Sequence, residues 1–415
     1  MKLFVPDWDD RVDPGYDFIT DRHTLNRNPY RDDLYAHELM GVSAYDGVLI
    51  SLMSLGDGGR KREAIERAGM RSYLRLPPSL ELLGDCGAYS YIAEHQPRVD
   101  TATAFALYDR LGFDYGVSVD HLIVPEFDAE RHFRYELTLR NAEEFLALHR
   151  KIKPRFTPIG AVQGWDVPSY VQAARANVDM GYDYLALGGL ARSNTATIAS
   201  ILQSVREVVP PHVRMHIFGV ARLRLLALFL AFNVTSVDSA APLRQAWLSA
   251  RENYYTLDRS YAAIRIPVAR EERSKPQTLI GRSPVALAEL AEAEQSALAA
   301  LRAYDRGAIR LQAAFDAVIA YDSLLADRLD AKNTRRRHEL YYETLRDRPW
   351  KHCQCPVCRE LGVEVIIFRG NNRNRRRGFH NLWVVQQRIK QLSTRPDDLP
   401  VLSNKASYNL PLPYH

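Results

Sequence analysis

Between residues 46 and 240 the chain alternates short apolar runs with longer stretches of helical periodicity, and this alternation limits its fold more than any other feature. The apolar runs are Val48–Ile50, Glu81–Leu83, Val117–Val119, Ile159–Val162, Tyr184–Leu187, Met215–Phe218 and Val234–Val237, with Tyr73–Leu76 as a weaker eighth candidate. Short runs without polar alternation are typical of strands that are buried on both faces. The helical stretches between them include 141–151, 169–180 and 195–209. Repeated strand–helix units of this kind predict a parallel α/β fold.

The residues at the ends of these runs distinguish a closed barrel from an open sheet. Small or functional residues follow six of the runs: Asp85, Asp120, Gln163, Gly188 with Gly189, Gly219, and Asp238. A (β/α)8 barrel builds its site from the C-terminal ends of many strands. An open sheet concentrates its site at one switch point instead. We therefore predict a (β/α)8 TIM barrel whose mouth carries these residues.

The character of the chain changes after the barrel region. Residues 283–330 are rich in Ala, Leu and Glu, and their leucines recur at helical spacing on both sides of Gly307. This pattern predicts a helical hairpin that breaks near Gly307. The expected divisions are 1–250 for the barrel core, 251–344 for a helical insertion, 345–390 for a zinc-binding subdomain with the last barrel helix, and 391–415 for a C-terminal tail.

Composition narrows the class of protein further. With 46% hydrophobic and 25% charged residues among 415, the chain can bury a full core, so disorder is excluded. Four cysteines are too few for a disulfide scaffold. The N-terminus lacks the apolar stretch of a signal peptide, and the longest apolar run, Leu225–Phe232, is too short to span a bilayer. We expect a cytoplasmic protein without a membrane segment.

Three of the four cysteines form a cluster, Cys353-x-Cys355-x-x-Cys358, and His380 follows after 21 intervening residues. Three thiolates and one imidazole are a known tetrahedral ligand set for Zn(II). A closed set of four leaves no position for water, so we expect one structural zinc ion. His352 and His338 are the competing candidates for the fourth ligand, although His352 adjoins Cys353 and would strain the chelate ring.

The net charge of +5 conceals one strongly basic segment. Residues 331–390 contain 15 Lys or Arg and 5 Asp or Glu, whereas the remainder contains 40 and 45. A basic segment on a slightly acidic body suggests a polyanion bound at one place, and the alternative is a solvated charged helix. Five arginines are expected on a loop held by the zinc site, where they would contact nucleic-acid phosphates: Arg369, Arg373, Arg375, Arg376 and Arg377.

Two carboxylates, Asp85 and Asp238, each end a buried run and would face the barrel mouth. A pair of carboxylates there suits glycosidic chemistry, in which one attacks the sugar carbon and the other moves protons. Taken singly, either residue could instead cap a helix or support another side chain. Cys86, beside Asp85, is expected to be a small packing residue.

The order of these motifs resembles that of the tRNA-guanine transglycosylases. The matching segments are Asp85–Tyr89, Val162–Gly164, Gly188–Ala191, His216–Val220, Val237–Ala240 and, after the cysteine cluster, His380–Leu382. The resemblance spans about residues 40–250 and 345–390. It implies that Asp238 is the nucleophile and that Asp85 is the general acid/base. It also implies base-binding roles for six residues: Asp120, Gln163, Gly188, Gly189, Tyr89 and Phe218.

Other segments resemble the DNA-modifying branch of that family, the DNA 7-deazaguanine transglycosylases. These segments are the opening 4–10 and Tyr261–Pro267, and the long stretch 250–345 is unusual for the tRNA enzymes. The resemblance implies a DNA substrate and a 7-deazaguanine base such as 7-cyano-7-deazaguanine. Because the nucleophile is reformed at each exchange, the chemistry requires no redox or nucleotide cofactor. It allows an ATPase-like protein partner and a homodimer. The alternatives are the same exchange on tRNA, or a non-catalytic nucleic-acid-binding subunit.

Overall fold

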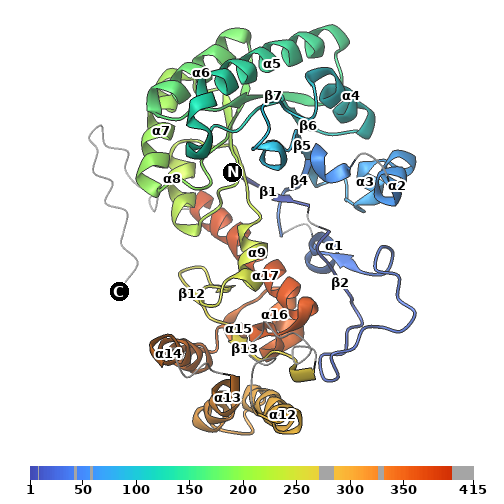
Figure 1. Ribbon diagram of the computed structural model, residues 1–415, viewed down its shortest axis with the longest axis vertical. Coiled ribbons are helices and arrows are strands. Elements are labelled where there is room, and N and C mark those ends of the chain that lie inside the picture. Colours follow the sequence, from blue (N-terminus) through green and yellow to red (C-terminus); the bar gives the residue numbers. More distant parts are fainter. Residues whose placement is uncertain (8, 42–43, 57–58, 271–284, 326–330, 395–415) are drawn as a thin grey trace. The chain divides into compact units, whose positions relative to one another are not determined.

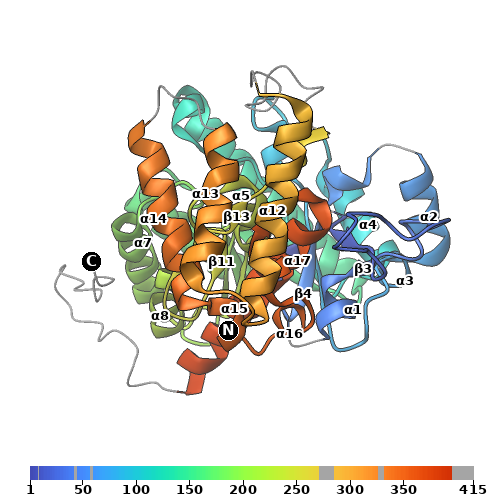
Figure 2. The same ribbon diagram turned by 90° about the horizontal axis from the view of Figure 1, so that it is seen from below.

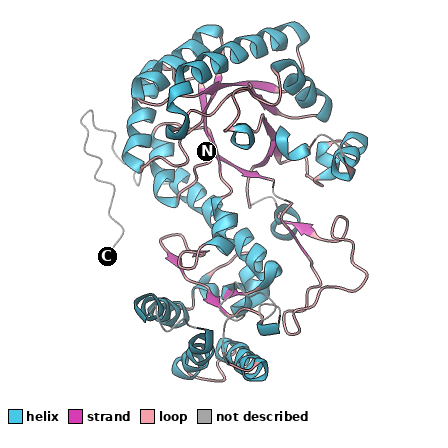
Figure 3. Ribbon diagram, viewed as in Figure 1, coloured by secondary structure: helices cyan, strands magenta, loops and turns pink. Residues whose placement is uncertain are grey.

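Eight parallel strands close into a barrel, as predicted (Figures 1 and 3). The computed structural model of the protein describes residues 1–7, 9–41, 44–56, 59–270, 285–325 and 331–394. The barrel strands are β1 (Lys2–Pro6), β4 (Gly47–Ser51), β5 (Glu81–Asp85), β6 (Tyr115–Val117), β7 (Thr157–Val162), β8 (Tyr184–Leu187), β9 (Arg214–Ile217) and β10 (Ser236–Asp238). Neighbours in sequence pair in order from β4 to β10, and β1 closes the ring between β10 and β4.

The eighth strand is not the one expected from the sequence. Tyr73–Leu76 does not form a strand, since the short helix α3 (Met70–Tyr73) ends there. The barrel is instead completed by β1, in which Phe4 pairs with Asp238 on one side and with Gly47 on the other. Its three central residues are buried, because a strand inside a closed parallel barrel is covered on both faces.

Helices connect the barrel strands, and three of them begin at a side-chain cap. They are α2 (Arg60–Ala68), α3, α4 (Thr101–Leu111), α5 (Arg131–Ile152), α6 (Val167–Met180), α7 (Thr195–Val208) and α8 (Leu226–Ala231), with the 3-10 turns η1 (Leu52–Leu55), η2 (Ala88–Tyr91), η3 (Pro125–Glu130) and η4 (Leu223–Leu225). The side chains of Asp100, Asp166 and Asn194 accept the backbone N–H three residues on and so start α4, α6 and α7. These caps position the loops that follow the strands.

The chain divides into two compact units. The barrel unit comprises Met1–Trp8, Tyr45–Ala241 and Gln386–His415, and the second unit comprises Asp9–Ala44 and Pro242–Val385. Residues 9–44 therefore group with the segment that contains the cysteine cluster. The four-part division expected from the sequence stays a proposal about folding units, and most of its C-terminal tail lies outside the described residues.

The second unit is mainly helical, with short two-stranded pairings. Its elements are β2 (Arg11–Val12), β3 (Leu34–Tyr35), α1 (Ala36–Met40), β11 (Tyr254–Tyr255), β12 (Ser260–Tyr261), β13 (Ile264–Arg265), α12 (Leu287–Asp305), α13 (Leu311–Leu325), α14 (Ala331–Asp347), α15 (Pro349–His352), α16 (Pro356–Leu361), η5 (Gly362–Ile366) and β14 (Ile367–Phe368). Two further helices, α9 (Ala241–Leu248) and α17 (Gly370–Thr394), contain residues of both units.

The predicted helical hairpin is present. Helices α12 and α13 pack side by side, and α14 lies next to α13 (Figure 2). The connection turns at Gly307, whose φ of +77° is a left-handed conformation that favours glycine. Among the described helices of the chain, none is both long and apolar enough to cross a membrane.

The arginine-rich segment 369–377 corrects the expectation of an exposed loop. All but its first residue belong to α17, and four of the five arginine side chains are buried: Arg369, Arg373, Arg376 and Arg377. Carboxylates distant in sequence explain this burial, because they supply the partners that a buried guanidinium requires. Asp21 contacts both Arg369 and Arg373, while Glu294 pairs with Arg369 at 2.7 Å.

The same contacts leave little of this segment available to phosphates. Arg376 donates to the carbonyl of Asp13, and Arg377 donates to the carbonyls of Val365 and Ala246. Arg375 is the partly exposed member, and it donates to the carbonyl of Arg11. The segment therefore ties residues 9–21 to the rest of the second unit. It is not laid out as a phosphate-binding surface.

We expect Arg373→Met to destabilise the protein by about 3–5 kcal/mol, because the largely buried carboxylates of Asp21 and Glu364 each lose one of their two guanidinium partners. The Arg373 side chain is 0% exposed and donates to Glu364 at 2.8 Å as well as to Asp21. Urea unfolding measures the loss. The matched control is Arg335→Met, whose side chain is 86% exposed and which should cost less than about 1 kcal/mol. Equal stability of the two variants would contradict this account of the arginine cluster.

Candidate active site and metal centre

The predicted site residues of the barrel unit gather at the C-terminal ends of its strands. Asp85 ends β5 and Asp238 ends β10. Asp120 follows β6 by three residues, Gln163 follows β7 directly, and Gly188 with Gly189 follows β8. Because all these strands are parallel neighbours in one barrel, the residues share its mouth.

Asp238 is held at one of its two carboxylate oxygens. Oδ1 accepts hydrogen bonds from the backbone N–H of Gly219 at 2.9 Å and from Nε2 of His216 at 3.1 Å. The residue is 5% exposed. His216 lies in β9, which pairs with β10 in the barrel, and Gly219 follows β9 by two residues. Adjacent strands therefore fix the orientation of this carboxylate.

Asp85 is a carboxyl group with an altered proton affinity. Burial is the main cause, and the charges of Asp120 and Asp238 add to it, so that the pKa of Asp85 rises from 3.8 to about 8. Hydrogen bonds from Gly87 and Ser51 oppose the shift. The residue as a whole is nevertheless partly exposed. A carboxyl that is protonated at neutral pH and accessible can act as a general acid.

Asp120 and Gln163 are two buried polar residues that contact each other, and with Cys86 they make up a polar patch. Gln163 Nε2 donates to Asp120 at 2.5 Å, and the Cys86 thiol donates to the other carboxylate oxygen at 2.9 Å. Burial raises the pKa of Asp120 and also that of Cys86. Cys86 therefore stays a thiol and supports Asp120, in addition to the packing role expected for it. Gln163 Oε1 is buried, and no hydrogen-bond partner for it lies among the described residues.

Glycine is required beside this patch. A Cβ on Gly188 would overlap the amide group of Gln163, and Gly189 has a φ of +74°. The Gly188 carbonyl accepts a hydrogen bond from the Tyr170 hydroxyl at 2.8 Å. The backbone can thus run close to Gln163 in a fixed orientation.

The two predicted aromatic residues differ in exposure. Tyr89 lies on η2 and is 68% exposed, and its hydroxyl accepts from Arg192 at 3.3 Å. Phe218 follows β9, packs against the barrel core and meets the His216 ring edge-on. Tyr89 thus offers a face to solvent, whereas Phe218 is anchored.

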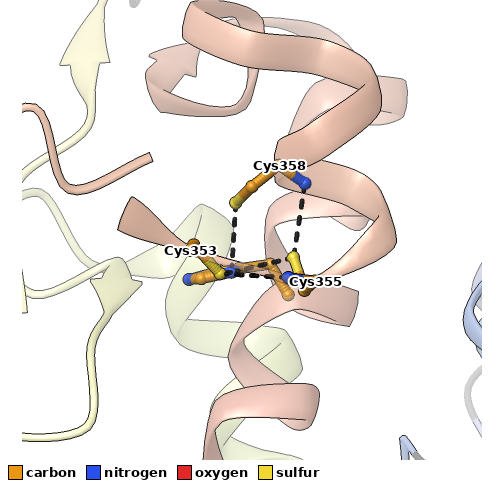
Figure 4. A group of neighbouring side chains, drawn as sticks. Cys353, Cys355 and Cys358 are labelled. Carbon is orange, nitrogen blue, oxygen red and sulfur yellow. Dashed lines mark hydrogen bonds between the residues drawn. The ribbon is translucent and has the colours of Figure 1, made fainter. Parts of the chain in front are cut away.

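The cysteine cluster of the second unit forms a candidate metal centre. Figure 4 shows the three cysteine side chains turned toward one another, and His380 Nδ1 lies 3.5, 3.4 and 3.3 Å from the sulfurs of Cys353, Cys355 and Cys358. All four ligand atoms lie within 4.8 Å of one another. Tetrahedral bonds of about 2.3 Å to sulfur and about 2.0 Å to nitrogen would separate those atoms by about 3.5 Å. The four residues could therefore hold one metal ion.

The surroundings orient this ligand set. His380 Nε2 donates to the Tyr255 carbonyl at 2.8 Å, which leaves Nδ1 free to bind a metal. Tyr254 stacks on the His380 ring, with 4.1 Å between centroids. Of the two competing histidines, His338 instead contacts Asp322 at 2.8 Å, and His352 is exposed and outside the cluster.

Sequence reasoning assigned no role to His216 or Ser236. Both are 0% exposed, and His216 Nδ1 lies 2.6 Å from the Ser236 hydroxyl. In the sequence, each is a polar residue inside a mainly apolar run. In the structure, the two occupy paired positions on the neighbouring strands β9 and β10. That pairing becomes visible only once the strand register is known.

Comparison with known proteins gives one extensive match. The DNA-guanine transglycosylase of Salmonella montevideo is 36% identical over 419 residues, which cover 96% of this chain and 99% of that protein. No protein-family model matches the chain. An identity of this level along nearly the whole of both chains shows that this protein belongs to the DNA-guanine transglycosylases, a family of pentosyltransferase enzymes.

Proposed function

We propose that this enzyme exchanges guanine in DNA for a 7-deazaguanine, 7-cyano-7-deazaguanine or a relative, through a covalent intermediate on Asp238. The main support is a pair of carboxyl groups in different environments at one barrel mouth, those of Asp238 and Asp85. Asp238 is held at one oxygen by two donors, and the pKa of Asp85 is raised to about 8. A nucleophile and a proton donor are the two groups that a double displacement at a sugar carbon requires.

The exchange would proceed in two displacements. In the first, Asp238 attacks C1′ of the deoxyribose, the bond to guanine N9 breaks, and the proton of Asp85 goes to the departing base. In the second, ionised Asp85 takes the N9 proton of the incoming base, whose N9 attacks C1′ and releases the Asp238 carboxylate. Each step balances without a redox or nucleotide cofactor.

The polar patch supports recognition of a purine. The carboxylate of Asp120 would accept from the N–H donors on the Watson–Crick edge of guanine. Gln163 Oε1, buried without a partner among the described residues, would accept another, since a buried acceptor left unpaired is costly. The backbone at Gly188 and Gly189 would complete the contacts. Tyr89 and Phe218 would cover the two faces of the base.

A DNA substrate requires an opening step. Guanine stacked in a duplex cannot reach a barrel mouth, so its nucleotide must be flipped out or the duplex opened, at a cost of a few kcal/mol. We propose that an ATPase-like partner supplies this step on duplex DNA. Single-stranded DNA should then be the better substrate for the isolated enzyme.

For the metal centre we propose one structural zinc ion. Three thiolates and an imidazole are the donor set that zinc prefers, and a ligand set of four is closed to water. Its role would be to hold together the segment around α15 and α16, because helices of four and six residues are too short to be stable on their own.

Zinc removal should therefore unfold part of the second unit. Cys355→Ser is expected to lose the metal and lower the melting temperature, because Cys355 is fully buried within the cluster. Metal analysis of the purified variants, together with circular dichroism, measures both effects. Cys86→Ser is the control and should keep about one zinc per chain, since Cys86 lies outside the cluster. A metal-free Cys355→Ser protein with unchanged melting would contradict the structural role.

The function itself is tested by incubating the enzyme with labelled 7-cyano-7-deazaguanine and either single-stranded DNA or tRNA. Label is expected in DNA. Label in tRNA alone would favour the tRNA activity, and label in neither, with DNA still bound, would favour a non-catalytic subunit. The presence of both Asp85 and Asp238 at one mouth argues against the latter.

A further inference from the structure

A row of buried polar side chains inside the barrel ends at Asp238. The Tyr184 hydroxyl lies 2.6 Å from the Ser236 hydroxyl, which lies 2.6 Å from Nδ1 of His216. His216 Nε2 then lies 3.1 Å from Asp238 Oδ1. Tyr184, Ser236 and His216 are at most 2% exposed. Water cannot replace any of these contacts, so the row must satisfy its own donors and acceptors.

With an ionised Asp238, as a nucleophile must be, and a neutral His216 ring, the chemistry of the groups sets the direction of every hydrogen bond in this row. A carboxylate only accepts, so His216 must donate to Asp238 from Nε2. In the neutral ring Nδ1 is then an acceptor, and Ser236 must donate to it. The Ser236 oxygen in turn accepts from Tyr184, which keeps its proton because burial raises the pKa of Tyr184. Tyr184 and Ser236 therefore fix the tautomer of His216.

This arrangement distinguishes the two oxygens of Asp238. Both donors, His216 Nε2 and the Gly219 N–H, act on Oδ1. No hydrogen bond to Oδ2 is found within the described part of the chain. Oδ2 is thus the oxygen available to attack the sugar carbon, while Oδ1 is held by its two hydrogen bonds.

We propose that His216 is a positioning residue for Asp238, with Ser236 and Tyr184 holding its tautomer. The proposal rests on the nucleophilic role of Asp238 proposed above. When Oδ2 attacks C1′ and the base departs with its proton, the carboxylate becomes an ester whose carbonyl is Oδ1. When the incoming N9 attacks C1′, the ester C1′–Oδ2 bond breaks and the carboxylate charge returns.

Hydrogen bonds to a charged carboxylate are stronger than those to a neutral ester carbonyl. The His216 contact therefore stabilises the free enzyme more than the covalent intermediate, and it assists the release of Asp238 in the second displacement. Loss of His216 should slow the exchange and also shift the population toward the covalent intermediate. A residue with a merely structural role would change the first of these quantities without the second.

The test uses the full chain, single-stranded DNA and radiolabelled guanine, so that no assumption about the 7-deazaguanine enters. For His216→Phe we expect the guanine exchange rate to fall about 10- to 100-fold, because the nucleophile loses its alignment. The ratio of covalent to free enzyme, measured by intact mass after acid quench, should rise about 10-fold. His149→Phe, a histidine of α5 that bonds the Phe156 carbonyl at 2.8 Å, is the control and should change neither.

Two milder variants separate this role from misfolding. Ser236→Ala keeps the barrel packing but frees the tautomer of His216, and should slow exchange by less than His216→Phe does. His216→Gln restores an N–H donor and should recover part of the rate. The positioning role would be overturned if the wild-type enzyme forms the adduct on Asp238 but His216→Phe has the wild-type exchange rate and the wild-type covalent fraction. Absence of any wild-type adduct on Asp238 would instead overturn the proposed function.

Discussion

Asp238→Asn is expected to reduce guanine exchange by about 10³-fold or more, because it removes the nucleophile while leaving its surroundings intact. The amide oxygen of asparagine can still accept from Gly219 and His216, which now contact Oδ1 of the carboxylate. The fold should therefore survive. The measurement is the rate at which labelled guanine enters single-stranded DNA.

The control for this substitution is Asp183→Asn, at an aspartate of the barrel unit whose side chain is 66% exposed. It should exchange guanine at the wild-type rate. An Asp238→Asn protein that is folded and exchanges guanine within about 10-fold of wild type would remove Asp238 from the chemistry, since loss of a nucleophile costs far more.

Asp85→Asn is expected to slow exchange by about 10²–10⁴-fold, the contribution typical of a general acid or base. Because the pKa of Asp85 is about 8, the wild-type residue carries its proton at neutral pH. The first displacement, followed by rapid quench, should therefore slow as pH rises through about 8. A flat profile of this step between pH 6 and 9 would contradict the assignment.

The same residue links stability to pH. The folded state keeps the Asp85 proton up to about pH 8, whereas the unfolded chain releases it near 3.8. The folded state thus binds more protons between these values, and this residue's contribution to the free energy of unfolding falls as pH rises. Asp85→Asn removes this pH-dependent fall in the free energy of unfolding. In urea unfolding, the free energy of unfolding of Asp85→Asn should rise relative to that of the wild type from pH 5 to pH 8. If the two free energies changed with pH in parallel, the raised pKa of Asp85 would be contradicted.

The barrel could be predicted from local pattern because a strand buried on both faces is apolar along its length. Seven of the eight strands overlap apolar runs of this kind. The pattern does not predict the strand β1, because β1 lies about 40 residues before β4 and a segment of the other unit separates the two. Only the closed ring shows that Lys2–Pro6 fills the gap between β10 and β4.

The arginine segment shows where local reading fails. Five arginines in nine residues indicate an exposed surface if burial is judged from the residues alone. Their carboxylate partners come from distant parts of the chain: Asp21 is 348 residues from Arg369. An ion pair between residues so far apart in the chain cannot be predicted from the sequence around either of them. His216 is similar, since its relation to Asp238 depends on the register of two strands.

In the proposed reaction Asp238 forms a bond to the sugar of DNA. The most direct measurement is peptide mapping by mass spectrometry after the enzyme is incubated with a single-stranded DNA oligonucleotide and quenched in acid. We expect a DNA adduct on the peptide that contains Asp238, absent from Asp238→Asn and accompanied by one released guanine per adduct. Guanine release and exchange without an adduct on that peptide would contradict the proposed reaction.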